Sequence, residues 1–164
     1  MAVRKAARIA PGPDPVDYEH DVAAWSVEQA RLLRAGLFDQ LDIEHIADEI
    51  EDVGKSEARE LASRMAVLLA HWLKWECQPL LRNPSWQNTI REQRKQVLRR
   101  LKRTPSLRPE LENPDFIEYV WSDARLAASR ETGIDIAHFP PEEYARPFHE
   151  VLREDWTLPS APGR

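Results

Sequence analysis

Apolar residues recur at helical spacing over one long segment of this chain, from Asp42 to Cys77. They are Ile43, Ala47, Ile50, Gly54, Leu61, Met65, Leu68 and Trp72, and carboxylates crowd the other faces. Side chains three, four and seven residues apart lie on one face of an α-helix. The pattern therefore predicts one amphipathic helix over about 42–77, which at 1.5 Å per residue would be about 50 Å long. We expect the shorter helices to pack on its apolar face.

Gly54 is the position at which this helix would break if it broke anywhere. Glycine weakens helices, and Gly-Lys-Ser is a common turn composition. The apolar positions before and after Gly54 nevertheless keep the same phase, and Gly54 itself falls on the apolar side. We therefore expect a continuous helix, with a neighbouring backbone packed closely at Gly54.

Cap residues and prolines predict the boundaries of the shorter helices. We expect helices at about 27–35, 84–102 and 114–131 and a short C-terminal helix near 147–153, begun in turn by Ser26, Asn83-Pro84, Asn113-Pro114 and Pro147. Neither a repeat nor a β-hairpin signal occurs between them. The predicted fold class is all-α, a compact helical bundle built on one long central helix.

Length and composition set the domain count and the compartment. A chain of 164 residues is enough for one domain with its own core. We expect a single helical domain over 17–159, between a flexible basic and proline-rich tail at 1–16 and a short tail at 160–164. Charged residues make up 31% of the chain, and no apolar run approaches the roughly 20 residues of a membrane span. A soluble, cytoplasmic protein without a membrane partner is predicted.

Enzyme signatures built on glycine are missing from the sequence. Five glycines occur, at Gly12, Gly36, Gly54, Gly133 and Gly163, and none belongs to a phosphate loop, a dinucleotide fingerprint or a nucleophile elbow. The single cysteine, Cys77, excludes an internal disulfide, and its place near a helix C-terminus should raise its thiol pKa. The sequence thus favours a protein without a cofactor and without catalytic residues.

Carboxylates at the start of the long helix are the weak candidates for a metal site. Oxygen ligands of this kind suit Mg²⁺ or Mn²⁺, and they are Glu44, Asp48, Glu49, Glu51 and Asp52. Acidic residues near a helix N-terminus are also stabilised by the helix dipole, without any metal. A metal-dependent hydrolase using this acidic face is therefore the weaker alternative, and a solvated face is the preferred interpretation.

His71 lies beside the apolar face of the long helix and could act as a general base. No serine, cysteine or acid is placed by the sequence to form a relay with it. Glu60 and Arg64 share its flank of the helix. We therefore predict that Glu60, Arg64 and His71 form a structural polar network.

Opposite charges are segregated along the chain. Nine acidic residues lie between Asp39 and Glu60, against Lys55 and Arg59. Seven basic residues follow on the third helix, against Glu92, and they are Arg91, Arg94, Lys95, Arg99, Arg100, Lys102 and Arg103. Such a helix is the type of surface that contacts phosphates. The acidic helix could also pair with it, within the molecule or between subunits. A nucleic-acid-binding or regulatory protein that uses the basic helix 91–103 is therefore the alternative and not the first prediction.

Several strings of the chain, in order, resemble one family. They are LLRAGLFDQLDIEHIADEIEDVGKSEARELASRMAVLLAHWLKW, WQNTIREQR, PSLRPEL and EDWTLP. The chain is similar over about residues 18–159 to the bacterial family called domain of unknown function 29. That family's pattern has two glutamates where this chain has Asp48 and Glu49, which keeps the acidic face. The resemblance implies a compact all-helical protein and no assigned activity.

We expect from these observations a non-enzymatic helical protein-interaction module. Six tryptophans and a long apolar helix face give more packing surface than a thin layer of helices can cover. The expected partner is a second copy of the chain, forming a homo-oligomer, or another protein.

Overall fold

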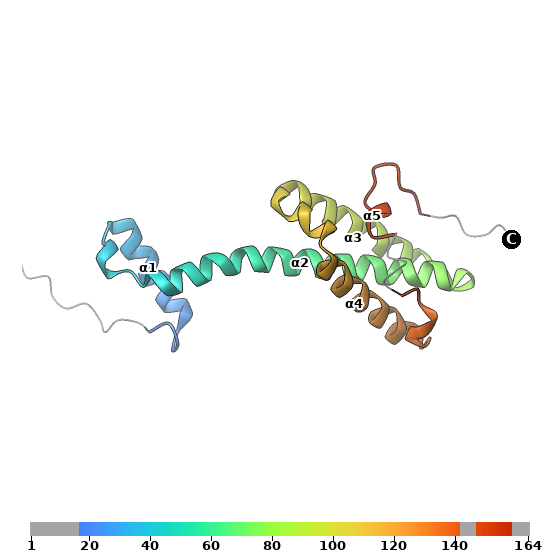
Figure 1. The fold of residues 1–164 in the computed structure, drawn as a ribbon, viewed down its shortest axis with the longest axis horizontal. Coiled ribbons are helices and arrows are strands. Elements are labelled where there is room, and N and C mark those ends of the chain that lie inside the picture. The colour runs from blue at the N-terminus through green and yellow to red at the C-terminus, as the bar shows by residue number, and fades with distance from the viewer. Residues whose placement is uncertain (1–16, 142–146, 159–164) are drawn as a thin grey trace, which may run out of the picture. The chain divides into compact units, whose positions relative to one another are not determined.

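The computed structural model describes residues 17–141 and 147–158, which fold into helices and contain no strand (Figure 1). The α-helices of this part of the chain are α1 (Val22–Ala35), α2 (Ile43–Cys77), α3 (Pro84–Arg103), α4 (Pro114–Thr132) and α5 (Pro147–Glu150). Short 3₁₀ turns connect them: η1 (Phe38–Gln40), η2 (Pro79–Leu81), η3 (Pro105–Glu112) and η4 (Ile136–His138). The predicted all-α class is confirmed. The predicted tails at 1–16 and 160–164 lie outside the described residues.

The long helix α2 is continuous over 35 residues, as its apolar phase predicts. Gly54 lies inside it, but the predicted close packing there is wrong, because a Cβ atom added to Gly54 would meet nothing within 4 Å. Gly54 is tolerated in an exposed part of the helix and not required by a neighbour. The same position starts a new compact unit, since the structure divides between Val53 and Gly54.

Unit 1 contains α1, η1 and the first three turns of α2. Helix α1 begins five residues earlier than predicted, because Asp21 and not Ser26 is its N-cap and accepts a hydrogen bond from the Ala24 N–H. It ends as predicted at Gly36, whose φ of 71° is the left-handed conformation that glycine adopts readily. Only Trp25, Gln29 and Leu32 are buried among the described residues of this unit.

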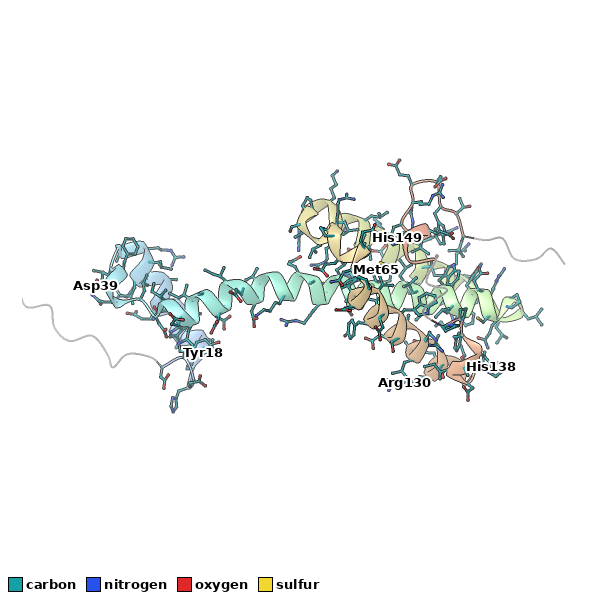
Figure 2. The ribbon with its side chains drawn as sticks, in the orientation of Figure 1. Tyr18, Asp39, Met65, Arg130, His138 and His149 are labelled. Carbon is teal, nitrogen blue, oxygen red and sulfur yellow. The ribbon has the colours of Figure 1, made fainter. Side chains whose placement is uncertain are left out.

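Unit 2 holds the large core, formed by the rest of α2 with α3 and α4. Buried side chains come from α2 (Leu61, Met65, Leu68, Leu69, Leu73), α3 (Ile90, Val97, Leu101) and α4 (Val120, Trp121, Ala124). Met65 marks the place where the three helices meet in Figure 2. Phe139 and Val151 add to this core from the C-terminal segments, and the Trp121 indole N–H donates to the carbonyl of Pro140 at 3.0 Å.

Helices α3 and α4 begin where the cap residues predict. Asn83 and Asn113 each accept a backbone hydrogen bond at the N-terminus, followed by proline in the first turn. The C-terminal helix α5 is shorter than the predicted 147–153, because the chain turns after Glu150. In the described part of the chain, no helix is both long and apolar enough to span a bilayer. That the chain from 17 to 159 forms a single domain stays a prediction.

Candidate interaction surfaces

An apolar groove runs between α1 and the first turns of α2, entirely within unit 1. Its volume is about 320 Å³, and its lining residues are Trp25, Ser26, Gln29, Ala30 and Leu33 of α1 with Ile46, Glu49, Ile50 and Val53 of α2. We call this the α1/α2 groove. Helical spacing places Ile46, Ile50 and Val53 on one face of α2, so their side chains form one wall.

The aliphatic side chains of the α1/α2 groove are exposed to an unusual degree. Leu33 is 45% exposed, Ile50 68% and Val53 65%. Val22, Val27, Phe38 and Ile43 of the same unit are exposed as well. A single exposed aliphatic residue is normal, but Leu33, Ile50 and Val53 line one groove together, and such clustering of exposed aliphatic side chains is typical of a binding surface. The prediction that shorter helices cover the apolar face of α2 therefore holds from Leu61 onward and fails for Ile43 and Ile50.

Polar contacts around Asp42 fix the position of α1 against α2 at one end of the groove. The Trp25 indole N–H donates to Asp42 Oδ2 at 3.1 Å, and the Asp42 backbone N–H donates to Gln29 Oε1 at 3.0 Å. Nδ1 of His45 lies 2.6 Å from the same Asp42 carboxylate. Its hydrogen bond to Asp42 raises the pKa of His45, and the same bond lowers the pKa of Asp42.

Tyr18 connects the segment before α1 to α2 (Figure 2). Its hydroxyl donates to Glu49 Oε1 at 2.7 Å, and its ring stacks on the His45 imidazole with centroids 4.1 Å apart. The hydrogen bond to Glu49 raises the pKa of Tyr18 to about 12, because it is lost when the phenol ionises. Glu49, which lines the groove, is thus held in place by its contact with Tyr18.

Negative charge dominates the unit that contains the groove. Between residues 17 and 53 the acidic side chains are Asp17, Glu19, Asp21, Glu28, Asp39, Asp42, Glu44, Asp48, Glu49, Glu51 and Asp52. The basic side chains in this range are Arg31, which pairs with Glu28 at 2.7 Å, and Arg34. An apolar groove is therefore set in a strongly acidic surface.

The five carboxylates that the sequence offers as weak candidates for a metal site belong to this acidic surface. Glu44, Asp48, Glu49, Glu51 and Asp52 are exposed on α2, and Glu49 accepts the Tyr18 hydroxyl hydrogen bond. In the described ranges, no group of three or more His, Cys, Asp or Glu side chains is arranged to hold a metal ion. The geometry gives the metal-dependent hydrolase no support.

Three of the seven basic residues of α3 form hydrogen bonds or ion pairs within unit 2. Arg94 donates from Nε to the Val151 carbonyl at 2.8 Å and from Nη2 to the Arg153 carbonyl, and its guanidinium lies over the Trp156 ring. Arg100 and Arg103 both form ion pairs with Glu57 of α2. These side chains hold the C-terminal segment and α3 in place.

The other four basic residues form an exposed stripe. Arg91, Lys95, Arg99 and Lys102 are all exposed, and steps of four, four and three residues put them on one face of α3. We call this the α3 stripe. It is about 16 Å long by the helix rise. Its apolar counterpart, Ile90, Val97 and Leu101, faces the core of unit 2.

The predicted polar network of Glu60, Arg64 and His71 is brought together only in part. Arg64 Nη2 lies 2.7 Å from Glu60 Oε1, and Arg100 of α3 lies 3.6 Å from the same oxygen. His71 makes a different contact, donating from Nδ1 to the Val67 carbonyl one turn earlier at 3.0 Å. Burial lowers the pKa of His71. This histidine is bonded within its own helix, and in the described part of the chain no hydrogen bond joins it to an acidic side chain.

Lys74 is a buried charge that the helical spacing of apolar residues does not indicate. It is 2% exposed, pairs with Glu131 of α4 and lies 5.0 Å from the centroid of the Trp86 ring. The α1/α2 groove was also missed. The signal for it was present in α1, where Ser26, Ala30 and Leu33 follow one another at helical steps of four and three residues, but an exposed surface and a buried one have the same periodicity.

Comparison with known proteins gives a family and no function. A protein-family model described as "Domain of unknown function DUF29" matches residues 18–157. No curated protein and no solved structure matches the chain.

Proposed function

The chain belongs to the family of domain of unknown function DUF29, whose function the match does not give. We propose that this member is a non-enzymatic module that binds a helix of another protein in the α1/α2 groove. The observation that carries this proposal is the exposure of Leu33, Ile50 and Val53 around a hollow of about 320 Å³. An amphipathic helix laid in an apolar groove is a common way for proteins to recognise one another.

Energetics support a partner on this surface. Removing aliphatic side chains from water contributes roughly 25 cal/mol for each Å² of apolar area. Unit 1 buries only Trp25, Gln29 and Leu32 among its described residues. Most of its aliphatic side chains therefore stay in water, and the free energy of burying them is not gained within the unit. A helix that covers Leu33, Ile50 and Val53 would supply it.

The proposal can be tested with helical peptides selected for binding. A display library of 20-residue helical peptides is selected on the full chain and counter-selected on the Ile50→Glu/Val53→Glu variant. We expect binders with apolar residues at positions i, i+3 or i+4 and i+7, whose NMR footprint falls on α1 and the start of α2. Binders that map to unit 2, or that bind the variant equally well, would contradict the proposal. Circular dichroism confirms that the variant is still helical.

Self-association, expected from the sequence, stays a prediction. A second copy is the rival occupant of the groove, and sedimentation velocity over a range of concentrations measures it directly. A dimer that Ile50→Glu converts to a monomer would place the second copy in the groove. A dimer insensitive to this substitution would place the contact elsewhere.

Nucleic-acid binding is the second candidate, and the α3 stripe is the observation that favours it. Arg91, Lys95, Arg99 and Lys102 lie on one exposed face, and neither an ion pair nor a hydrogen bond with another described residue engages their side chains. The test is fluorescence anisotropy with labelled single strands and duplexes at several salt concentrations. Charge reversal of Lys95 and Arg99 should abolish salt-dependent binding, whereas reversal of Arg108 and Arg130 in the same unit should not. Absence of binding at low salt ends this candidate.

A further inference from the structure

We propose that the helix bound by the α1/α2 groove is basic, with lysine or arginine on its polar face and aliphatic residues on the face that enters the groove. This inference rests on the proposed function and adds the chemistry of the partner. Its basis is the combination, on a single pair of helices, of exposed aliphatic side chains with a large excess of carboxylates.

The carboxylates lie on the same turns as the groove wall. Helix α2 carries Ile46, Ile50 and Val53 within three turns, and the same turns carry Glu44, Asp48, Glu49, Glu51 and Asp52. Of these carboxylates, Glu49 lines the groove, whereas helical spacing turns Glu44, Asp48 and Glu51 toward the opposite face of α2, where they add to the negative charge of the unit. Lysine and arginine side chains flanking an apolar stripe would therefore reach Glu49 at the rim and be attracted by the charge of the whole unit. Their methylene stems also cover apolar surface while the charged ends stay in water, so they suit the edges of such a groove.

Charge disfavours a second copy placed groove to groove. Each copy brings eleven acidic and two basic side chains between residues 17 and 53, as the sequence shows. Two such surfaces in contact would place like charges together, and like charges across an interface cost binding energy and exclude wrong partners. The same charges attract a basic helix and raise its rate of association.

The basic helix α3 of a second copy does not meet the requirement either. It carries the α3 stripe, but its apolar residues Ile90, Val97 and Leu101 are buried in the core of unit 2. Docking α3 in a groove would offer mainly charged and polar side chains to Leu33, Ile50 and Val53. An occupant needs a free apolar face together with basic flanks, which points to a segment of a different protein.

Two synthetic peptides test the charge of the partner. Both are amphipathic helices with leucine at the same positions, and they differ only in a polar face of lysine or of glutamate. A third peptide has the lysine composition in a shuffled order without an apolar face. Binding of each to the full chain is measured by fluorescence anisotropy at low and at high salt, since salt screens exposed charges.

We expect the lysine peptide to bind at least about tenfold more tightly than the glutamate peptide, and salt to reduce this difference. Ile50→Glu should abolish binding of the lysine peptide. Glu49→Gln should lower its affinity, because Glu49 lines the groove, and the matched variant Glu118→Gln on α4 should not. The shuffled peptide should bind weakly, because charge without an apolar face is not enough.

The outcomes separate this inference from the function on which it rests. Equal binding of both amphipathic peptides, lost in Ile50→Glu, would keep the interaction module and overturn the basic partner. Equal binding of the shuffled and the amphipathic lysine peptides would overturn both, since the groove would play no part. A homodimer that Ile50→Glu dissociates and that excludes the lysine peptide would place the second copy in the groove and overturn the basic partner.

Discussion

Asp42 and His45 are joined across the first turn of α2, with Oδ2 and Nδ1 2.6 Å apart, and the same Asp42 oxygen accepts the indole N–H of Trp25 from α1. One carboxylate therefore connects the two helices that form the α1/α2 groove. The stability of this helix pair should depend on the charges of Asp42 and His45.

The pH dependence of unit 1 follows from these two groups. The pKa of His45 is raised, so its contribution to stability is complete below about 6.5, the usual histidine value, and is lost as pH rises through the folded-state pKa. The pKa of Asp42 is lowered, so its contribution is present above its usual value near 4 and is lost at more acid pH. Hydrogen exchange of α1 amides should show the greatest protection between these limits. His45→Gln should remove the loss at neutral pH, and His138→Gln should not.

Tyr18 should titrate above the ordinary tyrosine range. Its pKa of about 12 comes mainly from the hydrogen bond to Glu49, with partial burial and the Glu49 charge adding to it. In a spectrophotometric titration, Glu49→Gln should lower this pKa, because a neutral amide holds the phenol proton less strongly. The Tyr18→Phe variant identifies which phenol is responsible. An unchanged titration in Glu49→Gln would mean that the contact is not formed in solution.

The contrast between the core of unit 2 and the groove of unit 1 can be measured with a pair of aliphatic truncations. Leu69 is fully buried, so Leu69→Ala should lower the free energy of unfolding by about 2–5 kcal/mol. Ile50 is 68% exposed, so Ile50→Ala should change it by no more than about 0.5 kcal/mol. Urea unfolding followed by circular dichroism gives both values. A large loss in Ile50→Ala would show that the groove is filled within the chain.

Buried Lys74 gives a prediction about charge in the core. Its ammonium pairs with Glu131 and lies near the ring of Trp86. Lys74→Met keeps the packing volume and removes the buried charge, so it should be neutral or stabilising. Glu131→Gln removes the counter-charge and leaves the ammonium buried, so it should cost about 1–3 kcal/mol by urea unfolding. If Lys74→Met were the more damaging of the two, the ion pair would be more important than the desolvation of Lys74.

Periodicity and caps predicted most of the fold, and the exceptions have physical causes. The phase of Ile43 through Trp72 gave the continuous α2, but helical spacing does not tell whether an apolar face is covered, so the exposure of Ile50 was not predicted. Ser26 has the composition of an N-cap, yet Asp21 caps α1 and Ser26 bonds to the Ala23 carbonyl inside the helix. Local sequence offered two competing caps, and the contacts of Tyr18 and Trp25 with α2 lie around the earlier one.

The roles of the charged residues at the candidate surfaces were also only partly predictable from the sequence. Charge segregation predicted the acidic start of α2 and the basic α3, but the sequence could not separate the structural arginines from the exposed ones. Arg94 donates hydrogen bonds to carbonyls of the C-terminal segment, 57 residues or more away in the chain. Such long-range contacts leave no local pattern in the sequence. His71 was grouped with Glu60 and Arg64 by helix phase, but its ring bonds to a carbonyl of its own helix.

Glu57 of α2 pairs with both Arg100 and Arg103 of α3, and its titration should contribute to the acid stability of unit 2. Partial burial alone would raise the pKa of Glu57, but the charges and hydrogen bonds of Arg100 and Arg103 outweigh it and lower that pKa. The stability it contributes is therefore present above about 4.3, the usual glutamate value, and is lost as pH falls through the folded-state pKa. Glu57→Gln should make unit 2 less stable at neutral pH and less sensitive to acid, as measured by urea unfolding from pH 3 to 7. Glu118→Gln, on the exposed face of α4, is the matched control and should leave the difference between neutral and acid pH unchanged, because Glu118 forms no ion pair with an arginine in the described part of the chain. A profile for Glu57→Gln that parallels the wild type would show that the Arg100 and Arg103 contacts contribute nothing to folding.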